Sequence, residues 1–128
     1  MINNPAQYDL DIYQDRDFST TFIIKDSSGS LVNITSWTCT AQIRPTYGSE
    51  TLIANFTVTT DVPTSAITMT LTDTTTLAID AENAITAGST ATSTNMVWDL
   101  AVDDVVADER FSLITGIVNF YETVTRAT

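Results

Sequence analysis

Hydrophobic and polar residues alternate with a period of two along most of the chain, most regularly near its end. In residues 116–126, Val118, Phe120 and Val124 fall on one face, whereas Asn119 and Tyr121 fall on the other. This stretch is rich in β-branched and aromatic residues, which is typical of a β-strand. Because such a strand needs partners, the rest of the chain is predicted to fold around it.

The same alternation predicts several earlier strands, separated by turn signals rich in Gly, Pro, Asp and Ser. The predicted strands cover residues 8–13, 18–24, 37–44, 52–58, 67–71 and 96–102, and residues 109–114 are expected to form a hairpin with the final strand. Seven or eight short strands at this spacing indicate an all-β protein. We expect one antiparallel β-sandwich of the Ig-like kind, forming a single domain over residues 1–128.

Three segments depart from the alternation. Residues 73–79 are predicted to form a short helical turn, with Asp73 as its N-cap and with Leu77 and Ala78 facing inward. Residues 80–94 are small and polar, which favours a flexible surface loop that could become ordered against a partner. Residues 1–6 are expected to form a polar lead.

The charge of the chain narrows the choice of partners. Sixteen acidic residues against five basic ones give a net charge of −11. Such a surface repels nucleic acid and anionic membranes, and it suits a basic protein partner or a cation. The N-terminus does not resemble a secretion signal, and no apolar run approaches the roughly 20 residues that cross a bilayer. The protein is therefore expected to stay in the cytoplasm or to be assembled there into something larger.

Residues that commonly carry catalysis are scarce. The chain has no His and a single cysteine, Cys39. These counts exclude an intrachain disulfide, a zinc site built on several cysteines and every His-containing triad. Cys39 shares a face with Trp37 and Ile43, so we interpret it as a small buried hydrophobic residue. We expect neither an enzyme nor a bound cofactor.

The densest acidic group consists of Asp99, Asp103, Asp104, Asp108 and Glu109. Clustered oxygen ligands can hold Ca²⁺, but this spacing matches no EF-hand loop. A solvated turn is the favoured interpretation, because Asp is a usual turn residue. A solvated, non-binding role is likewise favoured for a second acidic group, which consists of Asp9, Asp11, Asp15 and Asp17. Paired carboxylates can also catalyse glycoside hydrolysis, but acids in turns and on outer faces do not indicate a cleft.

The aromatic residues divide into two groups. Trp37 and Trp98 could form a platform for sugars, but both lie in the apolar phase of their strands, which favours the core. Tyr13, Tyr47 and Tyr121 fall off that phase or in turns. Because Tyr suits half-wet surfaces, these three are our candidates for interface contacts.

Two of the few positive charges, Arg44 and Arg126, lie at the ends of predicted strands. Each could pair with an acidic residue of its own domain, or it could bridge to a neighbouring subunit, where Arg is favoured. Both are therefore further interface candidates.

The order of the segments carries a family resemblance. A strand ending at Arg44, the pair Asp99-Leu100, and a closing stretch from Gly116 to Thr125-Arg126 resemble a pattern in small Ig-like β-sandwich structural proteins of tailed bacteriophages. These proteins occur in tails, baseplates and fibre attachments, and they include the N-terminal domain of upper-baseplate proteins of lactococcal phages. Trp98 departs from the pattern, which more often has Tyr there.

The resemblance implies a structural role without catalysis, in several copies, within a virion assembled in the host cytoplasm. It implies docking to other virion proteins of the tail, neck, baseplate or fibre, and a free sheet edge is one physical route to such docking. The sequence leaves two alternatives open. One is a protein that decorates the capsid, and the other is a carbohydrate-binding or adhesin module.

Overall fold

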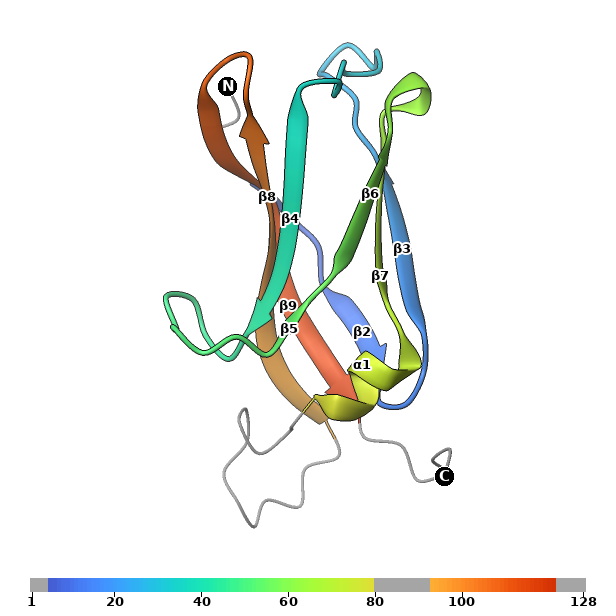
Figure 1. Ribbon diagram of the computed structural model, residues 1–128, viewed down its shortest axis with the longest axis vertical. Coiled ribbons are helices and arrows are strands. Elements are labelled where there is room, and N and C mark those ends of the chain that lie inside the picture. The colour runs from blue at the N-terminus through green and yellow to red at the C-terminus, as the bar shows by residue number, and fades with distance from the viewer. Residues whose placement is uncertain (1–4, 80–92, 122–128) are drawn as a thin grey trace.

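The chain folds into two packed β-sheets (Figure 1). The computed structural model describes residues 5–79 and 93–121, with the backbone only at 93–95. The larger sheet contains β1 (Ala6–Gln7), β2 (Leu10–Tyr13), β4 (Trp37–Arg44), β5 (Ala54–Asn55), β8 (Ser93–Asp104) and β9 (Glu109–Tyr121). The smaller sheet contains β3 (Phe18–Ile23), β6 (Thr57–Asp61) and β7 (Ala66–Leu71). The predicted β-sandwich is confirmed, and seven of these strands have four residues or more.

The direction of pairing departs from the prediction at one edge of the larger sheet. Strands β1 and β2 run parallel to β9, so that Ala6 lies opposite Ile114 and Leu10 opposite Val118. The other strand pairs are antiparallel. Alternation in residues 8–13 indicates a strand but carries no information on its direction. Ala6, which we expected in the polar lead, belongs to β1, whereas residues 1–4 lie outside the described part.

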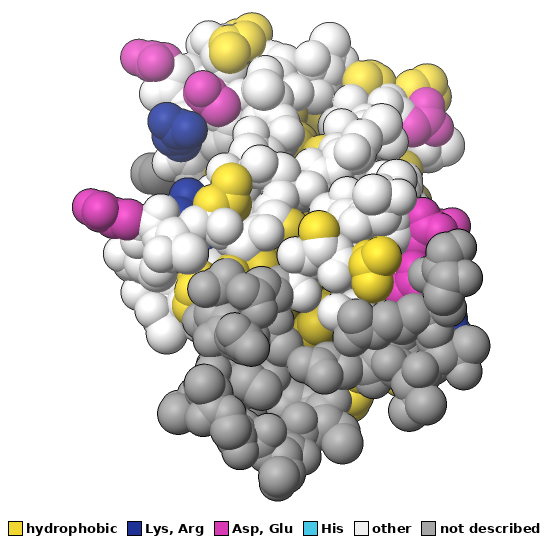
Figure 2. All heavy atoms as spheres, turned by 60° about the horizontal axis from the view of Figure 1, so that its bottom comes forward, with side chains coloured by type: hydrophobic (Ala, Val, Ile, Leu, Met, Phe, Trp, Pro, Cys, Tyr) yellow, Lys and Arg dark blue, Asp and Glu magenta, His cyan; other side chains and the backbone are white. Residues whose placement is uncertain are grey.

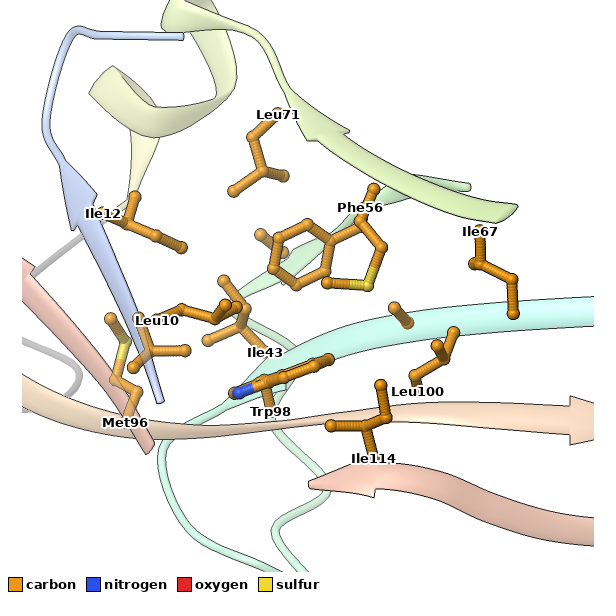
Figure 3. Packing of buried hydrophobic residues seen from close by; sticks show 14 of the residues in the cluster. Leu10, Ile12, Ile43, Phe56, Ile67, Leu71, Met96, Trp98, Leu100 and Ile114 are labelled. Atoms are coloured by element: carbon orange, nitrogen blue, oxygen red, sulfur yellow. The ribbon is translucent and has the colours of Figure 1, made fainter. Parts of the chain in front are cut away.

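The inward positions of both sheets form one core, as the alternation predicts. Trp98, Ile43 and Leu10 point from the larger sheet toward Phe56 and the smaller sheet (Figure 3). The ring of Trp98 is 1% exposed and its Nε1 donates a hydrogen bond of 2.8 Å to the carbonyl of Tyr8. A buried indole N–H needs such an acceptor, so this bond fixes the exposed segment between β1 and β2 against the edge of the core.

The predicted strand over residues 52–58 is divided between the two sheets. Ala54 and Asn55 form β5 on the edge of the larger sheet, and β6 begins at Thr57 in the smaller sheet. Phe56 lies at the crossing, where its side chain is buried and its N–H bonds to the carbonyl of Ala41. Ala54 and Phe56 face the core, while Asn55 and Thr57 face solvent, so the alternation continues where the chain passes from one sheet to the other. The sequence pattern therefore does not reveal the change of sheet.

The predicted hairpin between residues 109–114 and 116–126 is wrong. Strand β9 runs without a break through Gly116 and pairs with β8, with a register shift opposite Leu100 and Ala101. A Cβ at Gly116 would lie 1.9 Å from the carbonyl oxygen of Tyr8 and 2.9 Å from Trp98 Nε1. Gly116 therefore marks a close approach of two backbone segments and not a turn.

Helix α1 (Asp73–Ala78) confirms the predicted helical turn, but its cap and its inner face differ from the prediction. The N-cap is Thr72, whose side chain accepts a hydrogen bond from the N–H of Thr75. Thr76 is buried, whereas Leu77 and Ala78 are exposed. The loop predicted over 80–94 lies outside the described residues as far as 92, and residues 93 and 94 belong to β8. In the described part, no helix is long and apolar enough to span a membrane.

Candidate functional site

The described interface candidates gather on the outer face of the larger sheet. Tyr13, Arg44 and Tyr121 point away from the core on β2, β4 and β9, and Tyr47 lies over the same face in the loop after β4. We call this surface the tyrosine face. It comprises Asp11, Tyr13, Gln42, Arg44, Tyr47, Val97, Asp99, Ile117, Asn119 and Tyr121. Arg126, the remaining candidate, lies outside the described residues.

Two tyrosines form a stacked pair on this face. Tyr13 and Tyr121 are direct partners in the parallel ladder, and their rings lie 4.9 Å apart at 20°. The Tyr13 side chain is 51% exposed. Beside the pair, Asn119 donates a hydrogen bond of 3.2 Å to Asp11. Desolvation and the nearby Asp11 carboxylate raise the pKa of Tyr121, so the phenol stays neutral and presents a hydrogen-bonding group in water.

Arg44 positions the loop that follows β4. Its guanidinium donates to the carbonyl of Ser49 at 3.1 Å and to the Gln42 side chain at 2.9 Å. Gln42 in turn donates to Asn55 of β5 at 3.0 Å. This chain of hydrogen bonds joins the edge strand to the loop. Arg44 therefore pairs within its own domain, with amide and carbonyl oxygens and not with an acid.

Tyr47 forms the wall of a shallow hollow of about 270 Å³ on this face, together with Arg44 and Asp99. Its hydroxyl donates a hydrogen bond of 3.2 Å to the carbonyl of Gly116, and the residue is 62% exposed. Asp99 is half-buried there, and desolvation raises its pKa against the opposing effects of Ser112 and Arg44. The hollow thus combines an exposed ring with a cation and an anion that are not in ion-pair contact.

The residues that were considered as possible Ca²⁺ ligands, but favoured as a solvated turn, form no metal site in the described structure. Within the described part of the chain, no group of three or more acidic, His or Cys side chains could hold a metal ion. Asp104 instead stabilises the turn between β8 and β9, where it accepts hydrogen bonds from Ser36 and from the backbone of Val106 and Ala107. Asp103 lies opposite Arg110 in the ladder, and Asp108 occupies the turn with φ of 54°.

The acidic residues before β3 act as hydrogen-bond acceptors that the sequence did not predict. Asp9 accepts a hydrogen bond of 3.0 Å from the N–H of Ile117 in β9. Asp17 accepts one of 2.7 Å from the N–H of Asp73 at the start of α1. Asp9 and Asp11 are exposed, as expected, but Asp15 is buried beside Arg16. The carboxylates of Asp9 and Asp17 thus stabilise connections between elements that are far apart in the sequence.

The candidates for a sugar platform occupy different environments. Trp98 belongs to the core, as predicted. Trp37, the first residue of β4, is half-buried, and its ring stands edge-on to that of Phe111 with centroids 5.7 Å apart. Cys39 packs half-buried against the core, and burial raises the pKa of its thiol. The two tryptophans are therefore not side by side on one surface.

The outer face of the smaller sheet carries a surface that sequence analysis did not single out. Two rows of three hydroxyl side chains cross its strands, and we call them the threonine face: Ser19, Thr70 and Thr57 in one row, Thr21, Thr68 and Thr59 in the other. The hydroxyls of Thr21 and Thr68 are hydrogen-bonded at 2.9 Å. The signal in the sequence was a hydroxyl residue at every second position of three separate strands.

The molecule is a mostly-β, two-sheet, sandwich-like protein. The tyrosine face gives its larger sheet an aromatic and charged outer surface. Comparison of the sequence with protein-family models and with curated proteins finds no match in either.

Proposed function

We propose that the protein is a non-enzymatic structural component of a tailed-bacteriophage virion. In this proposal it acts at the tail, neck or baseplate, or as an adaptor that attaches fibres, and it docks to other virion proteins in several copies. The resemblance in the order of segments supports this proposal, and the sandwich fold is compatible with it. Since one fold serves many functions, the surface has to carry the argument.

The observation that carries the proposal is the gathering of Tyr13, Arg44, Tyr47 and Tyr121 on one face. Exposed aromatic rings supply large contact areas with little loss of side-chain entropy, and Tyr and Arg are enriched at protein interfaces. The hydrogen bonds of Arg44 and Tyr47 hold this surface in place before any partner arrives. A preformed surface loses less entropy on association.

The roles of the acidic residues favour docking over catalysis. Asp9, Asp17 and Asp104 accept hydrogen bonds that stabilise loops and turns. A general acid or base needs a reacting group within hydrogen-bond reach in a cleft, whereas these carboxylates serve the fold. We therefore propose binding without turnover, and without nucleic acid or membrane as partner.

Particles from the source lysate provide the test. Gradient-purified particles would be blotted for the protein after denaturation and then labelled with gold-conjugated antibody for electron microscopy. Label at the tail, neck or fibre base is the expected result. Label spread over the head would instead identify a capsid decoration protein. A negative blot would overturn the virion proposal, and the carbohydrate-binding alternative would then be tested by glycan titration.

A further inference from the structure

Two turns lie at the end of the sandwich opposite α1, at the top of Figure 1, and their side chains line a groove. It lies between the turn of residues 25–31 and the turn that joins β8 to β9, and its volume is about 660 Å³. Its apolar lining comes from Ile24, Val32, Trp37 and Phe111. This volume falls within the range of roughly 300–1,000 Å³ that is typical of ligand pockets.

Aliphatic side chains beside this groove are unusually exposed. Val105 and Val106 in the turn are 65% and 83% exposed, and they directly precede Ala107, which lines the groove. Leu31, which is also exposed, directly precedes the lining residue Val32. Turns are usually built from Gly, Pro, Asn, Asp and Ser, and adjoining exposed apolar residues mark interaction sites.

The opposite end of the sandwich is different. Helix α1 lies across it, and Thr76 and Ile79 are buried there. Where grey atoms do not cover this end in Figure 2, hydrophobic side chains are scattered among polar surface. Leu77 of α1 is 37% exposed, whereas Val105 and Val106 beside the groove are the most exposed large aliphatic residues of the described chain.

Hydrogen bonds hold both walls of the groove. On one side, Asp26 accepts bonds from the N–H groups of Ser28 and Ser30, at 2.9 and 3.0 Å. On the other side, Asp104 accepts bonds from Val106 and Ala107, and the N–H of Val105 bonds to the carbonyl of Ser36 at 3.2 Å. A groove with both walls fixed can bind without first having to order itself.

The rim of the groove is negative. Asp26, Asp104 and Glu109 border it, against a single positive charge at Lys25. Hydrogen bonds from Ser28 and Ser36 lower the pKa of Asp26 and Asp104, respectively, so both carboxylates are ionised at neutral pH. A cationic partner is therefore attracted, and an anionic one is repelled.

We propose that this groove binds a segment of another polypeptide, which inserts a large apolar side chain between the two turns and places Lys or Arg against the rim. A second copy of this chain fits the rim poorly, because each copy has a net charge of −11. The site is separate from the tyrosine face, and the proposal does not depend on a place in a virion.

A library of random dodecapeptides, selected on the full-length protein, tests this proposal. We expect enrichment of peptides in which an apolar residue is flanked by Lys or Arg. Such a peptide, made synthetically, should change the fluorescence of Trp37, and Trp37→Phe should abolish that change. Loss of the contact with one valine should weaken binding about tenfold in Val106→Ser, and Glu109→Lys should weaken it as well.

The control is Leu52→Ser, which removes another exposed aliphatic side chain, away from the groove. It should leave peptide binding unchanged. Val106 is so exposed that its substitution should not disturb folding, which circular dichroism would verify. The proposal is overturned if no peptide is enriched, or if enriched peptides bind Val106→Ser and Glu109→Lys as tightly as the original protein. Self-association that Val106→Ser abolishes, without any peptide binding, would also overturn it.

Discussion

The two outer faces of the sandwich follow the same alternation but carry different chemistry. The threonine face consists of short hydroxyl side chains in two cross-strand rows, without a charged residue in either row. The tyrosine face combines a stacked ring pair, a guanidinium and half-buried or exposed carboxylates. Alternation thus decides which side chains are exposed, while their chemistry decides what the exposed surface can do.

The physical roles of the two faces differ accordingly. Thr is a good strand former that stays soluble, and paired Thr side chains contribute to the stability of the sheet. Large rings and charges at half-exposed positions add little to stability but much to association. We therefore expect substitutions on the threonine face to change the free energy of unfolding, and those on the tyrosine face to change docking.

The largest effect on stability is expected below the tyrosine face, at Gly116. In Gly116→Ala the added methyl would lie 1.9 Å from the carbonyl oxygen of Tyr8, and backbone atoms cannot move aside cheaply. We expect a loss of about 3 kcal/mol in the free energy of unfolding, measured by urea denaturation. The hydrogen bond from Tyr47 to the carbonyl of Gly116 should weaken as well.

Gly48→Ala is the matched control. Gly48 has φ of +81° and open space around the missing Cβ, so only backbone strain is added. We expect a loss of about 1 kcal/mol. Equal losses in the two variants would contradict the close approach at Gly116.

Removal of the stacked pair should separate docking from stability. We expect Tyr13→Ala combined with Tyr121→Ala to reduce incorporation into particles about tenfold, as for the loss of interface anchors. The free energy of unfolding should fall by only about 1 kcal/mol, which is the typical stabilisation by an aromatic pair. Particles would be assembled with the double variant and the original protein supplied in equal amounts. Quantitative mass spectrometry of the purified particles would then give the ratio of the two proteins incorporated. Thr59→Lys, on the edge of the threonine face, should leave incorporation unchanged; a matching loss there would remove the distinction between the faces.

On the threonine face, Thr68→Ala should reduce stability without affecting docking. Thr68 lies in the central strand of its sheet and is hydrogen-bonded to Thr21 at 2.9 Å. Loss of this bond and of a β-branched side chain should cost about 1 kcal/mol in urea denaturation. Thr59→Ala, on the edge strand, should lower the free energy of unfolding by less than Thr68→Ala does. A larger loss in Thr59→Ala would contradict a stabilising role of the hydroxyl rows.

Two aspartates should show opposite pH dependence. Burial raises the pKa of Asp99 above its usual 3.8, so its ionised form is unfavourable in the folded state. Asp99→Asn should therefore be more stable than the original protein at neutral pH. This gain should shrink as the pH falls through the raised folded-state pKa.

For Asp104 the sign is reversed, because hydrogen bonds lower its pKa below 3.8. Asp104→Asn should be less stable than the original protein at neutral pH. This difference in the free energy of unfolding should shrink as the pH falls below 3.8 and through the lowered folded-state pKa. Urea denaturation between about pH 2.5 and pH 7 would measure both trends. Parallel trends in the two variants would contradict the assigned environments.

Local patterns were sufficient to predict much of this fold. The period of two gave the bounds of β4 and β7 within one residue, and it placed Tyr13 and Tyr121 outside the core. The division at Phe56 and the parallel pairing of β2 were not predicted, because both depend on contacts between segments far apart in the sequence. The hairpin expected between residues 109–114 and the final strand was wrong for the same reason, since the close neighbour of Gly116 is the distant Tyr8.

The candidate sites could likewise be predicted only in part, because their contacts join segments that are far apart in the sequence. The positions of Tyr47 and Arg44 suggested an interface, but the hydrogen bonds to Gly116 and Ser49 that fix them required the fold. The groove was missed although Val105-Val106 is an unusual turn sequence. Its significance depends on the turn of residues 25–31 lying opposite. The acidic groups were interpreted as solvated turns, but the hydrogen bonds that Asp9 and Asp104 accept from backbone N–H groups were not predicted.

Tyrosine labelling in free protein and in purified particles tests docking through the tyrosine face most directly. Tyr13, Tyr47 and Tyr8 are similarly exposed, at 51%, 62% and 50%, but Tyr8 packs against Phe22 of the smaller sheet. Iodination followed by mass spectrometry should show Tyr13 and Tyr47 protected in particles and Tyr8 still reactive. Equal reactivity of all three, protection of Tyr8 alone, or absence of the protein from particles would contradict docking through this face.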